Sequence, residues 1–150
     1  MVRKEIIQKS RILVVDDEPA NVLLLERILQ RGGYTNITTT TDSRKVLEFF
    51  SVYQPDIILL DLNMPHVDGL ALMVQLRSRI PDNTYLPILV LTADVAAKAR
   101  QSALSLGAKD FLTKPFDATE VLLRVYNLLE TRWLYVELRQ QIKTLEHESQ

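Results

Sequence analysis

The sequence contains no cysteine, which excludes disulfide bonds, thiol nucleophiles and thiolate metal sites. It also lacks an apolar run of the roughly 20 residues that cross a bilayer, and residues 1–10 lack the apolar stretch of a secretory signal. Neither sign of charge dominates: 18 Lys and Arg stand against 19 Asp and Glu. This balance argues against direct binding of nucleic acid, which needs a basic face. We therefore expect a cytoplasmic protein that neither spans a membrane nor binds nucleic acid.

The sequence contains several short apolar runs rather than one long run. Three of them contain four residues without alternation, and a fourth is shorter; they are residues 12–15, 57–60, 88–91 and 110–113. Such runs are typical of parallel strands that are buried on both faces. A threonine-rich stretch at residues 34–41 is expected to form an edge strand.

Segments with helical spacing separate these runs. Residues 19–31 have Pro19 near the expected helix start and two glycines after its end, and residues 69–80 and 96–106 show similar apolar spacing. Ser43 is expected to cap a further helix, and a last helix is expected to begin near Asp117. The alternation predicts an α/β fold with a doubly wound, five-stranded parallel sheet, in which ligands bind beyond the carboxyl ends of the strands.

Polar residues follow the apolar runs at this predicted edge. They are Asp16 and Asp17, Asp61, Thr92, and Lys114. Three carboxylates close together repel one another unless a cation holds them, and hard oxygen ligands suit Mg²⁺. A lysine and a hydroxyl suit the remaining oxygens of a phosphoryl group. The set therefore indicates phosphoryl transfer to a carboxylate.

The sequence resembles a receiver domain of bacterial two-component response regulators. The resemblance rests on five strings in register, at residues 12–18, 61–70, 91–93, 107–111 and 114–116. Together they extend over about residues 10 to 130. The resemblance implies a flavodoxin-like sheet with strand order 2-1-3-4-5.

The resemblance also implies a role for each site residue. Asp61 would accept a phosphoryl group from a sensor histidine kinase or a phosphotransfer protein. Mg²⁺, for which Mn²⁺ could substitute, would be bound by Asp16, Asp17, Asp61 and the backbone carbonyl of Asn63. Lys114 and Thr92 would contact phosphoryl oxygens, Phe111 would swing inward on activation, and the Lys114–Pro115 bond would be cis. The chain would be a regulator that catalyses only its own phosphorylation and dephosphorylation.

Other interpretations stay open at this point. Asp16 and Asp17 could be acids at a helix N-terminus, Thr92 a strand residue and Phe111 a core residue. A phosphatase of the haloacid dehalogenase type also uses a Mg²⁺-bound Asp, but it wants an acid where Asn63 stands. A pseudo-receiver that docks without phosphorylation, and the receiver of a hybrid histidine kinase, are further alternatives. Asn63 and Asp94 are expected beside the hydrolytic water.

The C-terminal segment extends beyond a receiver. We predict a lead at residues 1–10, a receiver at residues 11–130 and a helical extension at residues 131–150, since neither Pro nor Gly occurs from Asp117 to Gln150. A possible coiled-coil seam consists of Tyr135, Leu138, Ile142 and Leu145. It predicts a homodimer stem, with a solvated helix as the alternative. The face of residues 96–106, 110–113 and the last helix is a second candidate dimer surface. The joint at residues 127–132 resembles that before HD-GYP and other cyclic-di-GMP output domains.

Overall fold

The computed structural model describes residues 2–93 and 97–149 of the chain. Five parallel strands form one sheet in the order β2-β1-β3-β4-β5. The strands are β1 (Arg11–Val15), β2 (Asn36–Thr40), β3 (Ile57–Asp61), β4 (Ile88–Thr92) and β5 (Asp110–Thr113). The helices are α1 (Val2–Gln8), α2 (Pro19–Arg31), α3 (Val46–Tyr53), α4 (Gly69–Arg79), α5 (Ala97–Ser105) and α6 (Ala118–Glu148), with a 3₁₀ turn η1 (Ser43–Lys45) before α3. The predicted fold class and strand order are confirmed.

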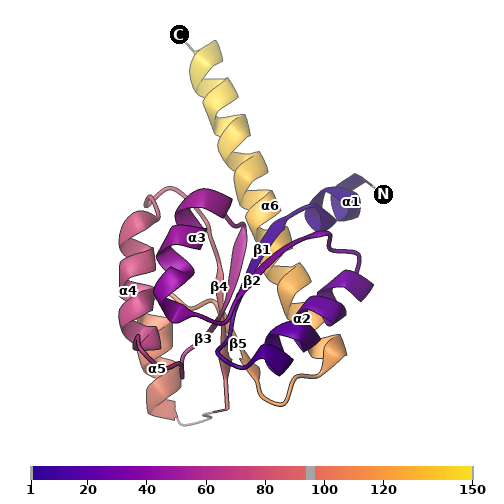
Figure 1. Ribbon diagram of the computed structural model, residues 1–150. Helices are drawn as coiled ribbons and strands as arrows, with labels where there is room; N and C mark the ends of the chain where they lie inside the picture. Colours follow the sequence, from indigo (N-terminus) through magenta and orange to yellow (C-terminus); the bar gives the residue numbers. More distant parts are fainter. Residues whose placement is uncertain (1, 94–96, 150) are drawn as a thin grey trace.

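Helices cover both faces of the sheet (Figure 1). Alternate residues of β1 enter two separate apolar cores: Ile12 and Val14 pack with α1, α2 and α6, whereas Leu13 and Val15 pack with α3, α4 and α5. Every residue of β3 and β4 is buried. The unbroken apolar runs of the sequence therefore reflect strands that contact helices on both sides.

Gly32 ends α2 and lets it approach α6 closely. A Cβ atom at Gly32 would lie 2.4 Å from a methyl group of Leu122 on α6. The expected helix of residues 19–31 is found with these bounds, and Pro19 occupies its first turn.

Ser43 does not cap the helix after β2, contrary to the expectation. The side chain of Asp42 accepts a hydrogen bond from the backbone N–H of Arg44, and η1 precedes α3. The hydroxyl of the buried Ser43 donates instead to the carbonyl of Pro65, 2.9 Å away. Asp is as good a capping residue as Ser, so the neighbouring Asp42 takes the capping role and Ser43 fixes the loop after β3.

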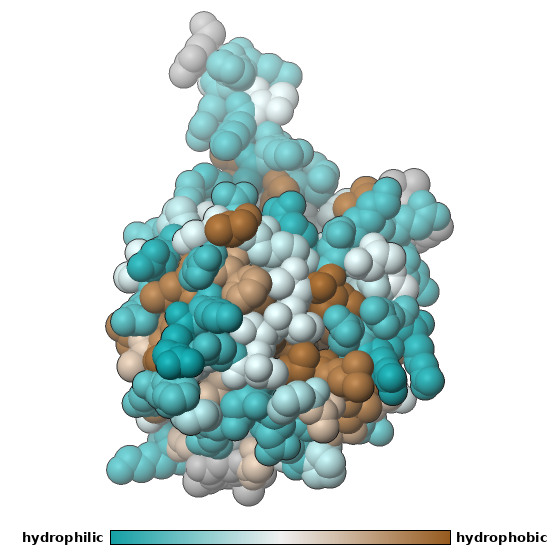
Figure 2. Space-filling view, viewed as in Figure 1, coloured by the Kyte–Doolittle hydropathy of each residue, from teal (hydrophilic) through white to brown (hydrophobic). Residues whose placement is uncertain are grey.

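α6 is one continuous helix that begins inside the fold and projects out of it (Figure 1). Asp117 caps its start by accepting from the backbone N–H of Glu120. Its first half buries Val121, Val125, Leu128 and Leu129, whereas residues 140–149 are exposed. On the face seen in Figure 2, the projecting part of α6 is mostly hydrophilic.

The expected lead at residues 1–10 contains the helix α1, which lies beside α6 (Figure 1). Ile7 is buried in the core, and the guanidinium of Arg3 lies 4.6 Å from the ring centre of Trp133. Residues 3–10 are therefore packed onto the domain rather than detached from it. None of the helices in the described part of the chain is long and apolar enough to cross a membrane.

Candidate phosphoryl site

The carboxyl ends of two neighbouring strands, β1 and β3, bring the acidic residues together. Asp16 and Asp17 follow β1, and Asp61 is the last residue of β3, which pairs with β1. One carboxylate oxygen from each of the three lies within 4.8 Å of the others. Asp16 and Asp61 are buried, and Asp17 is half-buried. The structure therefore brings together the three acidic residues that the sequence placed at strand ends.

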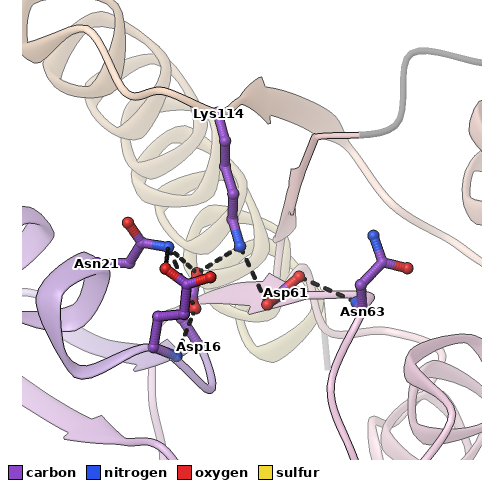
Figure 3. Close-up of polar contacts among 6 residues, drawn as sticks. Asp16, Asn21, Asp61, Asn63 and Lys114 are labelled. Carbon is purple, nitrogen blue, oxygen red and sulfur yellow. Dashed lines mark hydrogen bonds and ion pairs between the residues drawn. The ribbon is translucent and has the colours of Figure 1, made fainter.

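Lys114 lies between two of the carboxylates (Figure 3). Its Nζ atom is 3.0 Å from Asp16 Oδ2 and 3.1 Å from Asp61 Oδ2. The backbone N–H of Lys114 donates to the carbonyl of Thr92, and the Lys114–Pro115 peptide bond is cis. The lysine therefore enters the site from the end of β5, next to the end of β4.

Asn21 also contacts the site, and sequence reasoning missed it (Figure 3). Its amide nitrogen donates to both oxygens of Asp16, at 3.5 and 3.4 Å, and the backbone N–H of Glu18 donates to Asp16 Oδ1 at 3.0 Å. Asn21 stands five residues after Asp16 in the first turns of α2. A polar side chain in that position of a helix that follows a strand-end acid is the signal that could have found it.

The electrostatics of the cluster reflect an excess of negative charge. Burial and the nearby charge of Asp16 raise the pKa of Asp61 to about 6, against hydrogen bonds from the Asn63 N–H and Lys114 that lower it. Burial acts to lower the pKa of Lys114, but hydrogen bonds and charges of Asp16 and Asp61 outweigh it and raise this pKa. One ammonium group therefore only partly compensates the carboxylates, and a bound cation would complete the compensation.

The two predicted switch residues lie on neighbouring strands. Thr92 is buried at the end of β4, opposite Thr113 of β5. Phe111 is half-buried, packs against the core under α3, α4 and α5, and lies 5.2 Å from the guanidinium of Arg100 on α5. Asn63 is exposed in the loop after β3, where its N–H donates to Asp61 Oδ1 at 3.0 Å. Asp94 falls outside the described residues.

The predicted seam residues do not share one environment. Leu138, Ile142 and Leu145 are exposed, whereas the hydroxyl of Tyr135 donates to the carbonyl of Asn83 at 2.7 Å. The ring of Tyr135 also lies 6.0 Å from that of Tyr85. Tyr135 therefore contacts the receiver body, and the exposed apolar stripe consists of Leu138, Ile142, Leu145 and the neighbouring Leu134.

A second buried carboxylate lies at the opposite edge of the sheet, and sequence reasoning missed it as well. Asp56, just before β3, accepts from the backbone N–H of Arg11 at 2.8 Å and pairs with Arg132 of α6 at 2.9 Å. The guanidinium of Arg11 lies 3.9 Å away. Asp56 therefore fastens α6 to the start of the sheet, and it belongs to no acidic cluster among residues 2–93 and 97–149.

Comparison with known proteins identifies this arrangement. The response regulator receiver domain family matches residues 12–126, a range that contains Asp16, Asp61 and Lys114. The chain belongs to this family. Receiver domains of two-component systems accept phosphoryl groups as regulators rather than as catalytic enzymes, and they interact with histidine kinases or phosphotransfer proteins.

The similar proteins are response regulators of several kinds. Response regulator MprA of Mycolicibacterium vanbaalenii is 44% identical over 119 residues, which are 79% of this chain and 50% of MprA. Response regulator PleD of Caulobacter vibrioides is 40% identical over 131 residues, 87% of this chain and 28% of PleD. A putative response regulator from Chloroflexus aurantiacus has a TM-score of 0.73 at 32% identity, covering 81% of this chain and 98% of that structure. The chain therefore spans half the length, or less, of these curated relatives.

Proposed function

We propose that Asp61 of this receiver accepts a phosphoryl group from the phosphohistidine of a sensor histidine kinase or a phosphotransfer protein. A carboxylate oxygen of Asp61 would form the new P–O bond while the P–N bond to the donor imidazole breaks. The observation that carries this proposal is the position of Lys114 Nζ, within 3.1 Å of Asp61 and 3.0 Å of Asp16. From there the ammonium group can neutralise a phosphoryl oxygen on Asp61.

The acidic cluster fits Mg²⁺, and Mn²⁺ could replace it. Asp16, Asp17 and Asp61 would hold the ion, because their carboxylate oxygens lie within 4.8 Å of one another, and the backbone carbonyl of Asn63 would be a further ligand. When bound, Mg²⁺ neutralises charge on the phosphoryl oxygens. Hydrogen bonds from the Asn21 amide and the Glu18 N–H hold the Asp16 carboxylate in place before the ion binds.

Phosphorylation of Asp61 would change the structure through movements of Thr92 and Phe111. A phosphoryl group adds nearly two negative charges to a buried site, and Thr92 would move to hydrogen-bond one of its oxygens. Phe111 would then turn inward beside Thr92 and change the face formed by α5, β5 and α6. The strand pairing of β4 with β5 connects the two residues.

Labelling by a small phosphodonor tests this function. Acetyl phosphate with Mg²⁺ should retard the wild-type chain on a Phos-tag gel, and Asp61→Asn should abolish the retardation while leaving the circular dichroism spectrum unchanged. Asp82→Asn, which removes an exposed carboxylate far from the cluster, serves as the matched control. EDTA should reduce wild-type labelling strongly.

Other outcomes would select the alternative functions. Wild-type labelling that persists in Asp61→Asn would contradict the assignment, and no labelling of the wild type would favour a phosphorylation-independent docking module. Continuous turnover of a phosphate ester would favour a phosphatase of the haloacid dehalogenase type. Single stoichiometric labelling agrees with the proposal, whether the full-length protein is a response regulator or a hybrid kinase.

We further propose that residues 11–130 form the receiver and that residues 131–150 form a homodimer stem or a joint to an output domain. The exposed stripe of Leu138, Ile142 and Leu145 supports the stem, since exposed apolar stripes at this spacing favour helix pairing. Analytical ultracentrifugation with beryllofluoride and Mg²⁺ should show a dimer that Leu138→Glu with Ile142→Glu abolishes. If that variant keeps the dimer, the face of α5, β5 and α6 is the dimer interface instead.

A further inference from the structure

A groove lies at the edge of the sheet opposite Asp61, where the loop after α4 meets α6. Two adjacent hollows of about 230 and 260 Å³ form it, and Thr84 and Tyr85 line both of them. We call this continuous depression the basic groove. In the hollow of about 260 Å³, one wall is the loop after α4 and the other is the part of α6 that leaves the domain. The hollow of about 230 Å³ is lined by the end of α4, the loop after it and the segment between α5 and β5.

Cationic side chains outnumber acidic ones in the lining of the basic groove. They are Arg77, Lys109, Arg132, Arg139 and Lys143, and Asp82 is the single acidic residue in the lining. Within residues 2–93 and 97–149, only Arg132 of these five cations forms an ion pair, with Asp56. The groove therefore concentrates uncompensated positive charge on a chain whose formal net charge is −1.

The walls of the groove are held by contacts within the chain, and two of its cations lie along α6 at the rim. Tyr135 donates to the carbonyl of Asn83, its ring packs near Tyr85, and Lys109 Nζ lies 5.5 Å from the centre of the Tyr85 ring. Arg139 is half-buried and Lys143 is exposed. Long cationic side chains on a rigid base are suited to an anionic ligand that brings several charges.

Arg132 also retains hydrogen-bonding capacity. One terminal nitrogen of its guanidinium contacts Asp56 at 2.9 Å, but its buried Nε atom has no acceptor among the described residues. Buried donors in folded proteins almost always have a partner. A carboxylate that entered the groove beside Tyr135 would supply one.

The dimensions of the groove decide which class of anion fits. Each hollow is smaller than the roughly 300 Å³ of typical small-molecule pockets, whereas Arg132 and Lys143 are about 16 Å apart along the helix. An elongated ligand that contacts several cations along α6 therefore fits better than a single phosphate or nucleotide. Five cations, of which Arg132 is already paired with Asp56, are fewer than the roughly 6–10 phosphate contacts of a protein whose nucleic-acid binding is strongly salt-dependent.

Apolar residues adjoin the cations. Val136 lines the groove, and Leu138 and Ile142 are exposed about 100° around α6 from Arg139 and Lys143. We propose that the basic groove binds an acidic, partly apolar segment of a partner protein. Its carboxylates would pair with Arg139, Lys143 and Lys109, and its apolar side chains would cover Val136.

Fluorescence anisotropy with the full 150-residue chain tests this proposal. The probe is a labelled peptide of about 16 residues, roughly 24 Å long as a helix, made of Glu, Ala and Leu with a Glu in every turn. Arg139→Glu with Lys143→Glu should weaken binding by about tenfold or more, because like charges then face each other. Arg27→Glu with Lys45→Glu changes charge equally outside the groove and should leave binding unchanged.

Two further variants test whether peptide binding depends on charge in the groove, on correct folding or on phosphorylation of Asp61. Arg139→Gln with Lys143→Gln keeps good helix formers at both positions and should also weaken binding, which excludes misfolding as the cause. Asp61→Asn should bind the peptide as the wild type does, because the groove lies at the other edge of the sheet. Failure of the labelling experiment would therefore leave this test intact.

The proposal is wrong if the wild type does not bind the peptide, or if the charge reversal at Arg139 and Lys143 leaves binding unchanged. It is also wrong if a peptide with Gln in place of every Glu binds equally well. A single-stranded oligothymidylate of equal charge that binds more tightly, with the same loss on charge reversal, would assign the groove to nucleic acid instead.

Discussion

The two ends of β3 each carry a buried aspartate, and their surroundings differ in charge balance. At the carboxyl end, Asp61 shares one lysine with Asp16 and lies beside Asp17. At the other end, Asp56 has a backbone N–H, the guanidinium of Arg132 and, at 3.9 Å, that of Arg11. Both carboxylates meet a basic residue from the C-terminal part of the chain, yet only Asp61 lies in an excess of negative charge.

The difference separates a structural ion pair from a reactive site. A carboxylate whose charge is compensated within the protein stabilises the fold and has no need of a ligand. A carboxylate that shares its counter-charge gains from a cation that binds beside it, such as a metal ion. Burial alone would not distinguish them, since both residues are buried.

The largest effect on stability is expected at Asp56. Asp56→Ala should lower the free energy of unfolding by about 3 kcal/mol, because it leaves Arg132 without its partner at the buried end of the sheet. Urea denaturation followed by circular dichroism measures this. The folded fraction of the variant should still be labelled by acetyl phosphate, and loss of labelling in folded protein would contradict the distinction between the two ends.

The partner of Asp56 can be tested in the same way. Arg132→Met alone, and combined with Asp56→Ala, completes a double-mutant cycle in which we expect a coupling free energy of about 1–2 kcal/mol. Additive effects of the two substitutions would show that the ion pair does not fasten α6.

Substitution of Asp61 should have the opposite effect on the free energy of unfolding. In EDTA, Asp61→Asn should raise the free energy of unfolding by about 2 kcal/mol above pH 6, because it removes a buried charge beside Asp16. The folded pKa of about 6 exceeds the ordinary value of 3.8, so the folded wild type binds the extra proton between these values. Wild-type stability should therefore fall as pH rises from about 4 to about 6, and the variant should lack this fall.

Thermal unfolding of both proteins at several pH values in EDTA provides the measurement. Equal stabilities across the whole range, or an advantage of the variant that appears only below pH 4, would contradict the charge excess at this end of β3. Asp82→Asn again serves as the control, since its carboxylate lies outside the cluster.

The smallest effects concern the backbone on either side of β3. Gln54 before the strand and His66 after it have positive φ angles of 54° and 76°. Gln54 ends α3 in the left-handed conformation, and His66 is the centre of a turn in which the Val67 N–H donates to the carbonyl of Pro65. Gln54→Gly and His66→Gly should each raise the free energy of unfolding by about 0.5–1 kcal/mol.

The rates at which acetyl phosphate labels these two variants provide a second test of the difference between the two ends of β3. His66→Gly loosens the loop that presents the Asn63 N–H to Asp61, so it should alter the rate of labelling, whereas Gln54→Gly should not. Equal labelling rates in both variants would mean that the turn at His66 only connects β3 to α4.

The sequence predicted the residues that depend on strand ends and missed those that depend on packing between distant segments. Asp16, Asp61 and Lys114 each follow a short apolar run, and parallel strands bring such positions to one edge. Asp56 and Arg132 are 76 residues apart with no motif around either, so only the packed position of α6 pairs them. Tyr135 matched the heptad spacing of Leu138 and Ile142, but the nearby Asn83 carbonyl offered it a hydrogen bond within the chain.

The unbroken course of α6 makes it a lever with its fulcrum at the Asp56–Arg132 pair. From Arg132 to Glu148 the arm is about 24 Å long, so a tilt of about 10° at the fulcrum displaces its tip by about 4 Å. The shorter arm crosses the receiver beside β5, the strand that contains Phe111 and leads to Lys114. The arm on the receiver side, from Ala118 to Arg132, is about 21 Å long, so a displacement at its start would reach the tip with similar size, because no joint in the helix absorbs it.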